Sequence, residues 1–366
     1  MSLKLGQKEV MEGNEAMAEA ALLAGCRFYA GYPITPSTEI LEHMAYRLPQ
    51  VGGVYVHAET ENEAINLCWG AAAGGARAMT ASTGTGIALM QESFAELANA
   101  QVPVVVINMA REPSYRQVTR GGGHGDYHHI VLCPSGVQEA ADLVQRAFYL
   151  ADKYRTPVII LGDFVLGKTM ESVVFNKLDE SDLPPKAWAI GDGQGRGSRP
   201  VTFLGYQPGK TDVSVDAMLR AMEKHPTIKE REVLWETQHT DGADIIFVAY
   251  GTSGRFLKYA VHQARAAGAK VGFFRPISLW PFPENQLSDL AKRAKAIVVF
   301  ETSAGQMIED VYLSVQGQAP VHAFGVGKKG GAGKDGGSFG VSAELDVEYL
   351  EKRVMEYVRL VESGGR

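Results

Sequence analysis

An unbroken apolar run is the feature that most restricts how this chain can fold. Residues Pro103 to Asn108 contain the run Val-Val-Val-Ile, which has no polar position. A strand with one face in water alternates apolar and polar side chains, whereas a strand buried on both faces does not. The run therefore predicts a strand inside a parallel sheet that helices cover on both sides.

Similar apolar runs alternate with helical segments over residues 1–172. Strands are expected at 26–31, 54–58, 76–82, 103–108, 130–132 and 157–162, and helices at 7–25, 39–48, 59–73, 87–100 and 137–154. Regular alternation of strand and helix is typical of a parallel α/β domain, which we therefore predict for this region.

A rigid turn joins the first expected strand to the next helix. Its sequence is Gly-Tyr-Pro-Ile-Thr-Pro-Ser, residues 31–37. The rings of Pro33 and Pro36 fix φ, and Thr35 is placed to cap the helix, with Pro36 at the first helical position. Ligands of open α/β sheets bind at strand–helix edges of this kind. The turn is therefore either a ligand-binding edge or only a well-capped connection.

The alternation stops after residue 172 and resumes near residue 241. Residues 173–240 contain Pro184-Pro185 and a run from Gly191 to Gly195, with helices expected at 213–224 and 227–238. We interpret them as a connecting segment packed on the first domain. A second α/β domain is predicted for residues 241–366. Its strands are expected at 245–250, 270–274, 296–301 and 321–324, its helices at 252–267, 287–293, 306–315 and 347–360, and a glycine-rich loop with three lysines at 325–340.

Composition narrows the class of protein. The chain has 366 residues, 45% of them hydrophobic, and a formal charge of -6, which gives a nucleic-acid partner no electrostatic support. No run has membrane-spanning length, and no secretory signal is recognisable at the start. The three cysteines Cys26, Cys68 and Cys133 form no CxxC motif. This set predicts a cytoplasmic protein that holds no four-cysteine iron–sulfur cluster by itself, with Cys26 and Cys68 in the core.

Two glycine motifs suggest nucleotide binding and fail on their details. Gly84-Thr85-Gly86 follows a strand, but the third glycine of a dinucleotide motif is replaced by Leu89, and no acidic residue ends the next strand. Gly333-Lys334 is followed by Asp335, where a phosphate-binding loop requires Ser or Thr. Neither NAD binding nor a P-loop is predicted.

A histidine-rich loop is a candidate metal site. Three imidazoles and one carboxylate lie within residues 124–129. The loop is rich in glycine, and nothing in the sequence fixes the ligand geometry. A solvated polar loop is therefore the preferred interpretation.

Carboxylates and one arginine at strand ends are candidates for ligand chemistry. Glu59, Glu61 and Glu63 open a helix that is otherwise small and apolar. Acids in a first helical turn normally only complement the helix dipole, but one that faces a dry seam could pass a proton to a ligand nitrogen. Arg111 stands just beyond the run 103–108, where it could bind a carboxylate or lie on the surface in a charged turn.

Several motifs together resemble one enzyme family, the 2-oxoacid:ferredoxin oxidoreductases. The segments are Tyr-Pro-Ile-Thr-Pro-Ser at 32–37, Glu-Thr-Glu-Asn-Glu-Ala-Ile-Asn at 59–66 and Ala-Met-Thr-Ala-Ser-Thr-Gly-Thr-Gly at 78–86. Gly-Gly-Gly-His-Gly-Asp-Tyr at 121–127 is most similar to α subunits that act on branched-chain 2-oxoacids. Residues 249–252 and 275–283 resemble the family's second domain, which is similar to the transketolase C-terminal domain.

The resemblance implies the α subunit of a thiamine diphosphate enzyme, with a pyrimidine-binding domain and a transketolase-C-terminal-like domain. A β subunit would hold the diphosphate, its Mg²⁺ and an iron–sulfur cluster, and γ and δ subunits would complete the complex. The family decarboxylates a 2-oxoacid, transfers the acyl group to coenzyme A and passes electrons to ferredoxin. The branched-chain substrate 3-methyl-2-oxobutanoate is the first expectation, with 2-oxoglutarate and pyruvate left open.

The resemblance also implies roles for single residues. Glu61 matches the glutamate that protonates the aminopyrimidine ring, and Thr35 and Arg111 match the residues that bind the substrate. Tyr32, Pro33, Ile34 and Thr83 would line the cofactor pocket. Relatives have a longer stretch between the arginine and the Gly-Gly-Gly-His loop, so Arg116 and Arg120 remain alternatives for anchoring the substrate.

Two rival functions stay open on the sequence alone. The first is another thiamine enzyme, of the pyruvate dehydrogenase E1 β or transketolase kind. A neighbouring gene for a partner with CxxC motifs would argue against it. The second is a scaffold subunit that kept the fold and lost the chemistry, which the presence of both Thr35 and Glu61 disfavours.

Overall fold

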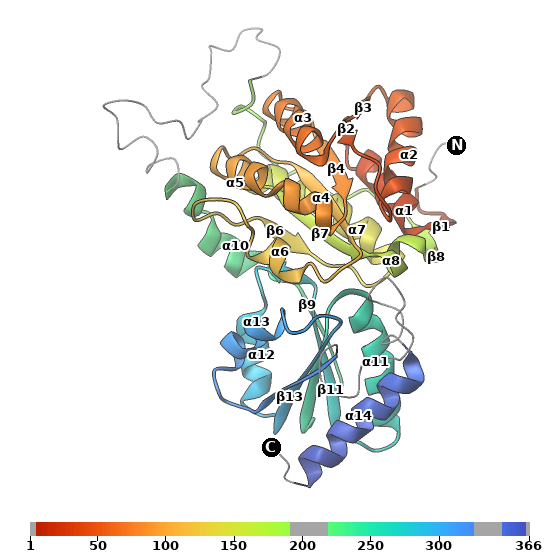
Figure 1. Cartoon of the computed structure of the whole chain (residues 1–366), viewed down its shortest axis with the longest axis vertical. Coiled ribbons are helices and arrows are strands. Elements are labelled where there is room, and N and C mark those ends of the chain that lie inside the picture. The colour runs from red at the N-terminus through yellow and green to blue at the C-terminus, as the bar shows by residue number, and fades with distance from the viewer. Residues whose placement is uncertain (1–4, 191–218, 326–345, 364–366) are drawn as a thin grey trace. The chain divides into compact units, whose positions relative to one another are not determined.

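The structure is a computed structural model that describes residues 5–190, 219–325 and 346–363 (Figure 1). These residues form two compact units, one from residues up to 110 and 117–231, the other from 111–116 and from 232 onward. The domain limits 1–172, 173–240 and 241–366 stay a prediction.

The first unit alternates strands and helices, as predicted. Its strands are β1 (Lys8–Glu12), β2 (Phe28–Gly31), β3 (Val54–His57), β4 (Ala78–Ser82), β5 (Val105–Ala110), β6 (Ile130–Leu132), β7 (Val158–Asp163) and β8 (Met170–Val174). Its helices are α1 (Gly13–Leu23), α2 (Thr38–Arg47), the 3-10 turn η1 (Leu48–Val51), α3 (Glu61–Ala73), α4 (Gly84–Leu89), α5 (Gln91–Asn99), α7 (Val137–Tyr154), α8 (Phe164–Lys168) and α10 (His225–Arg231). The short helix α6 (Tyr115–Thr119) spans the point where the chain returns to this unit.

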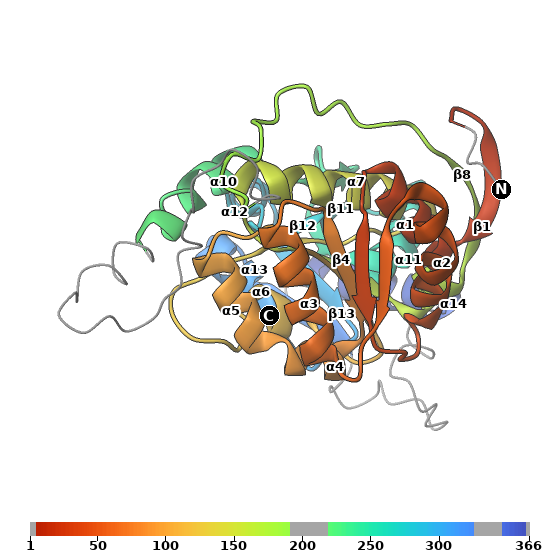
Figure 2. The ribbon, with the colours of Figure 1, turned by 90° about the horizontal axis from the view of Figure 1, so that it is seen from above.

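The main sheet of this unit is parallel and buried. Its strands lie in the order β6-β7-β5-β4-β2-β3, and each pair is parallel. Every residue of β5 is buried, which confirms the prediction drawn from its apolar run. Helices α1, α2 and α7 cover one face and α3, α4 and α5 the other (Figure 2).

The order of strands creates a switch point between β2 and β4. From β2 the chain crosses to β3 on one side, whereas from β4 it crosses to β5 on the other side. The two connections leave neighbouring strands in opposite directions, and ligands of open α/β sheets bind where this occurs. The turn after β2 and the loop after β4 therefore flank the expected binding edge.

The second unit is a smaller α/β sheet with the order β14-β13-β10-β11-β9. Pairs among β14, β13, β10 and β11 are parallel, and β9 is antiparallel to β11. Helices α11 and α14 pack together over a core that includes Phe247, Phe273 and Phe300. The elements are β9 (Trp235–Gln238), β10 (Ile245–Val248), α11 (Gly251–Ala266), β11 (Val271–Pro276), β12 (Ser278–Trp280), α12 (Glu284–Ala291), β13 (Ala296–Glu301), α13 (Ile308–Val315), β14 (Val321–Gly325) and α14 (Val347–Glu362).

Three expected helices were wrong in part. The segment 7–25 begins with β1, because residues 8–12 pair with β8. The helix expected at 87–100 is two helices, α4 and α5, divided at Met90. The helix expected at 227–238 ends at Arg231, because residues 235–238 pair with β11. The run 191–195, residues 213–218 of the expected helix 213–224 and the loop 326–340 lie outside the described residues, and residues 219–222 are helical.

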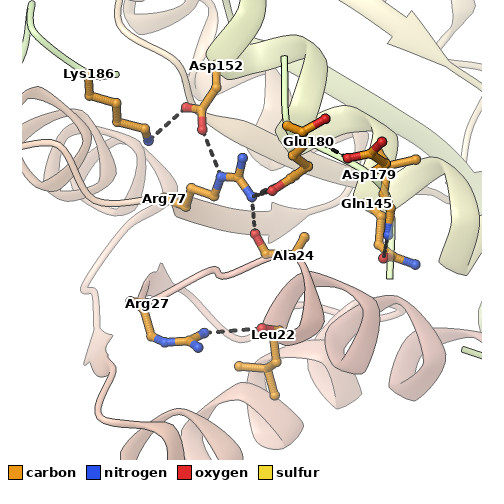
Figure 3. Close-up of polar contacts among 11 residues, drawn as sticks. Leu22, Ala24, Arg27, Arg77, Gln145, Asp152, Asp179, Glu180 and Lys186 are labelled. Atoms are coloured by element: carbon orange, nitrogen blue, oxygen red, sulfur yellow. Dashed lines mark hydrogen bonds and ion pairs between the residues drawn. The ribbon is translucent and has the colours of Figure 1, made fainter. Parts of the chain in front are cut away.

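A partly buried ion-pair network fastens residues 176–190 to the rest of the first unit (Figure 3). The Arg77 guanidinium bonds to Asp152 Oδ2 at 2.8 Å and to Glu180 Oε1 at 2.9 Å, and it donates to the carbonyl of Ala24. Lys186 Nζ lies 2.8 Å from Asp152 Oδ1. The network joins the start of β4, the end of α7 and the segment that follows β8, so it couples three parts of the chain far apart in sequence.

All three cysteines are free and buried, as expected for Cys26 and Cys68. Burial raises the pKa of the Cys26 thiol to about 12. Burial raises the pKa of the Cys68 thiol as well, so Cys26 and Cys68 are protonated core side chains.

Candidate functional site

The turn after β2 is closed by its own backbone and by Ser37. Ser37 donates from its backbone N–H and from Oγ to the carbonyl of Ile34, each at 2.9 Å. Pro36 is the third residue of the turn from Ile34 to Ser37, and the Thr35–Pro36 peptide bond is cis. Helix α2 begins at Thr38 with Ser37 at the N-cap position. The expected N-cap role of Thr35 was therefore wrong, because the turn holds Thr35 outside the helix.

Helix α1 holds this turn in place through Asn14, which is fully buried. Asn14 Nδ2 donates to the carbonyl of Pro36 at 2.7 Å and to Glu39 Oε2 at 2.9 Å. Glu39 also pairs with Lys168. Although burial opposes ionisation, the hydrogen bond from Lys168 keeps the pKa of the Glu39 carboxyl below its usual range. The turn is thus tied to two helices, and its outer side is left for other contacts.

The outer side of the turn is exposed. Tyr32 is 38% exposed, Pro33 and Thr35 are exposed, and Ile34 is half-buried. Large apolar groups fixed on the surface by a rigid turn are suited to contact a ligand or another chain.

The three acids at the start of α3 have different environments. Thr60 is the N-cap, and its Oγ1 accepts from the backbone N–H of Glu63 at 3.1 Å. The Glu63 carboxylate accepts from the backbone N–H of Glu59 at 2.7 Å, one residue before the N-cap, so it also turns back toward the start of the helix. Glu59 and Glu63 are exposed, whereas Glu61 is only 6% exposed. One acid of the three therefore faces the protein interior.

Glu61 lies against the end of β4 and the first turn of α4. Ser82 Oγ donates to Glu61 Oε1 at 3.5 Å, and this is a long hydrogen bond. A Cβ added at Gly86 would lie 2.0 Å from Ser82 Oγ and 2.6 Å from Glu61 Oε1. Glycine at position 86 is therefore required for the carboxyl group to occupy this place.

Further polar groups are buried at the same edge. Thr83, the N-cap residue of α4, is fully buried, and its Oγ1 has no hydrogen-bond partner among the described residues. Asn108 in β5 is fully buried, and within the described part of the chain neither atom of its amide has a partner. Buried polar groups are normally paired, so this edge has unused capacity for hydrogen bonds.

The candidate arginines differ in their surroundings. Arg111 follows β5 directly, its side chain is 24% exposed, and Nε lies 3.9 Å from Glu112 Oε1. Residues 111–116 group with the second unit. The Arg116 guanidinium is paired there with Glu309. The role of Arg111 stays a prediction, and the pairing of Arg116 makes it the weaker alternative.

The histidine-rich loop has its side chains in separate places. His129 is 3% exposed and its ring bonds to the carbonyl of Val118, whereas His124 Nε2 lies 3.1 Å from Glu96 Oε1 on the surface. Burial lowers the pKa of His129 to about 4. Among the described residues no group of three or more His, Cys, Asp or Glu side chains could hold a metal ion.

Sequence reasoning missed Asn14, Ser82, Gly86 and Asn108 as parts of the site. Ser82 and Gly86 lie within the motif 78–86, and Asn108 ends the apolar run of β5. A polar residue at the carboxyl end of a buried strand was the available signal for Ser82 and Asn108. Nothing in the local sequence relates Asn14 to the turn.

The fold is that of thiamine diphosphate enzymes. The chain superposes on the structure of 2-oxoglutarate:ferredoxin oxidoreductase from Magnetococcus marinus with a TM-score of 0.80 and 23% identity, over 96% of this chain and 65% of that one. A split-gene transketolase, an inactive β4 tetramer, matches with a TM-score of 0.56 and 15% identity, over 96% of this chain and 99% of that one. Both matches concern the fold alone.

Sequence comparisons identify the family. Residues 19–233 match the thiamine diphosphate-binding family of pyruvate flavodoxin/ferredoxin oxidoreductases, and residues 243–334 match core domain II of pyruvate:ferredoxin oxidoreductase. The chain is 41% identical over 319 residues to ketoisovalerate oxidoreductase subunit VorB of Methanothermobacter marburgensis, covering 84% of this chain and 89% of the relative. It is 38% identical over 337 residues to 2-oxoglutarate synthase subunit KorA of Methanocaldococcus jannaschii, covering 83% and 90%.

The chain therefore belongs to the 2-oxoacid:ferredoxin oxidoreductase family and is a subunit of an oxidoreductase. The family prediction made from the motifs is confirmed. Membership argues against the rival of the E1 β or transketolase kind. No helix among the described residues is long and apolar enough to cross a membrane.

Proposed function

We propose that this chain supplies the pyrimidine side of a thiamine diphosphate site in a 2-oxoacid:ferredoxin oxidoreductase. The proposed reaction is oxidative decarboxylation of a 2-oxoacid to acyl-CoA and CO2, with electrons passed to ferredoxin. A partner β subunit is proposed to hold the diphosphate, Mg²⁺ and an iron–sulfur cluster, in a complex that also contains γ and δ subunits.

The observation that carries the proposal is the place of Glu61. Its carboxyl group is buried at the switch-point edge and has one long hydrogen bond among the described residues. Thr83 Oγ1 and the Asn108 amide are buried at the same edge with no described partner. A buried acid beside unused polar groups fits a nitrogen heterocycle such as an aminopyrimidine.

The residues of this chain have separate proposed roles. Glu61 holds a proton at the pyrimidine ring nitrogen, which is a general acid–base task. The turn residues Tyr32, Pro33 and Ile34, together with Thr83, hold the ring in position and exclude water. Thr35 and Arg111 bind the substrate, and the arginine pairs with its carboxylate. Thiamine diphosphate, when bound, supplies the carbanion-stabilising chemistry of the decarboxylation.

If this chain supplies only the pyrimidine half of the thiamine diphosphate site, the isolated chain should bind the cofactor poorly. Tyr32, Pro33 and Thr35 are exposed, and among the described residues no group of three or more His, Cys, Asp or Glu side chains could hold a metal ion. We expect the isolated chain to bind thiamine diphosphate weakly or not at all, and the assembled complex to bind it tightly. Isothermal titration calorimetry measures both, and micromolar binding by the chain alone contradicts the half-site.

Glu61→Gln tests the proposed proton donor. In the reconstituted complex this variant keeps the shape of the side chain but removes its acid, so we expect turnover to fall by about 100-fold or more while assembly is unchanged. Glu59→Gln is the matched control, because Glu59 is exposed two residues earlier in the same turn region. Viologen reduction measures turnover, and size-exclusion chromatography measures assembly. Normal turnover of Glu61→Gln would contradict the proposed role of Glu61.

We propose 3-methyl-2-oxobutanoate as the preferred substrate. The ketoisovalerate oxidoreductase subunit supports this choice with 41% identity, but the 2-oxoglutarate synthase subunit is close at 38%. Viologen reduction with 3-methyl-2-oxobutanoate, 2-oxoglutarate and pyruvate, each with coenzyme A, decides among them. A kcat/KM that is highest for 2-oxoglutarate or pyruvate overturns the substrate while leaving the reaction class intact.

A further inference from the structure

Ser82 and Asn108 are neighbours across two parallel strands. Ser82 is the last residue of β4, and its register partner in β5 is Asn108. Partners in a parallel pair point to the same face of the sheet, and neighbouring strands are about 4.8 Å apart. Ser82 points toward Glu61 of α3, so Asn108 points toward that same face of the sheet.

The amide of Asn108 needs a partner that the described residues do not supply. The side chain is 0% exposed, and neither Oδ1 nor Nδ2 has a hydrogen bond. An amide buried without partners is disfavoured, and such a group in a native protein is commonly explained by a bound water or by a role in the site. A buried polar residue next to the candidate proton donor therefore points to a function.

We propose that Asn108 is a positioning residue that acts on Glu61 through Ser82. Asn108 Nδ2 donates to one buried water that donates to Ser82 Oγ, and Ser82 donates its single proton to Glu61 Oε1. The inference rests on the proposed role of Glu61. It assigns to Asn108 and Ser82 the task of fixing the carboxyl group in one orientation.

The physical reason lies in the chemistry of the hydroxyl group. A serine hydroxyl has one proton to donate and two lone pairs that accept, and the proton rotates to suit its surroundings. A donor on the lone-pair side fixes the direction of that proton and strengthens the bond that it makes. At 3.5 Å the bond from Ser82 to Glu61 is long, and catalytic hydrogen bonds often tighten when the ligand binds.

The test compares Asn108→Leu, Ser82→Ala and the double variant in the reconstituted complex. Because each single variant removes about one hydrogen bond from the chain, we expect it to lower kcat about 10-fold, with KM for the 2-oxoacid changed by less than about twofold. Because both residues act through one chain of bonds, the double variant should lose no more than the singles. Additive losses would mean that Asn108 contacts the ligand by itself and would overturn the relay.

Controls separate positioning from packing. Thr80 is buried on the same face of β4, two residues before Ser82, and its hydroxyl also has no described partner. Thr80→Val should therefore leave kcat unchanged, and Ser82→Thr should recover most of the turnover lost in Ser82→Ala. If Asn108→Leu fails to fold, Asn108→Ala takes its place, with thermal unfolding of each chain measured alongside.

A crystal structure of the wild-type complex supplies a readout independent of activity. We expect Asn108 Nδ2 within about 3.2 Å of a water that also bonds to Ser82 Oγ, and a displaced Glu61 carboxyl in Asn108→Leu. An Asn108 amide that bonds to groups other than this water overturns the inference. Full turnover of both single variants, while Glu61→Gln is inactive, also overturns it and leaves the proposed function intact. Normal turnover of Glu61→Gln instead removes the proposed function on which it depends.

Discussion

Replacing Gly86 by alanine tests whether catalysis depends on the place of the Glu61 carboxyl. The added Cβ would lie 2.0 Å from Ser82 Oγ, 2.6 Å from Glu61 Cγ and 2.6 Å from Glu61 Oε1. Carbon and oxygen atoms in ordinary contact are at least about 3.4 Å apart. The Glu61 side chain must therefore move by roughly 0.8 Å, and Ser82 by more than 1 Å or to another rotamer.

The expected effect on activity is large and the effect on stability small. A misplacement of about 1 Å at a reacting group costs on the order of 100-fold in rate. Overpacking costs about 1–3 kcal/mol, and alanine in place of a helical glycine returns roughly 0.5–1 kcal/mol. The free energy of unfolding of Gly86→Ala should therefore lie within about 2 kcal/mol of the wild-type value. The variant should nevertheless turn over about 100-fold more slowly.

Gly70→Ala is the matched control for this experiment. Gly70 is also helical, in α3, but a Cβ there would meet no atom within 4 Å. It should keep full activity and gain about 0.5–1 kcal/mol of stability. Viologen reduction by the reconstituted complex and chemical unfolding of the chain measure the two quantities. Gly86→Ala with wild-type turnover would refute the claim that the reaction requires the observed position of Glu61.

Two further predictions concern stability. Arg77→Met removes the centre of the ion-pair network and leaves Asp152 paired only with Lys186. We expect the free energy of unfolding, measured with urea, to fall by about 3 kcal/mol. The control Lys292→Ala removes an exposed ion pair and should leave this free energy unchanged. A loss no larger than that of the control would mean that the network is only a surface feature. Burial keeps the pKa of His129 at about 4 in the folded chain, below its value near 6.5 when unfolded, so the unfolded state takes up the proton first as pH falls. Between pH 7 and pH 5 the wild type should therefore lose about 2 kcal/mol more stability than His129→Gln, and equal losses would contradict the buried neutral imidazole.

The sequence by itself determined the fold class and the family. The apolar run of β5 and the regular alternation of strands and helices predicted a parallel α/β domain, because a strand buried on both faces has no room for polar residues. The motif at 32–37 placed a turn at the end of β2, and the motif 59–66 placed three acids at the start of α3.

Only the tertiary structure decided what depends on contacts between distant residues. Residues 235–238 are a strand because β11 is there to pair with them, although their local sequence favoured a helix. The burial of Glu61 depends on Ser82 and Gly86, and the place of the turn at 31–37 depends on Asn14. Sequence periodicity reports which face of an element is apolar, whereas the order of strands in a sheet decides which side chains from different elements meet. The sequence could therefore assign the site to one edge of the sheet. Which side chains meet at that edge could be seen only in the tertiary structure.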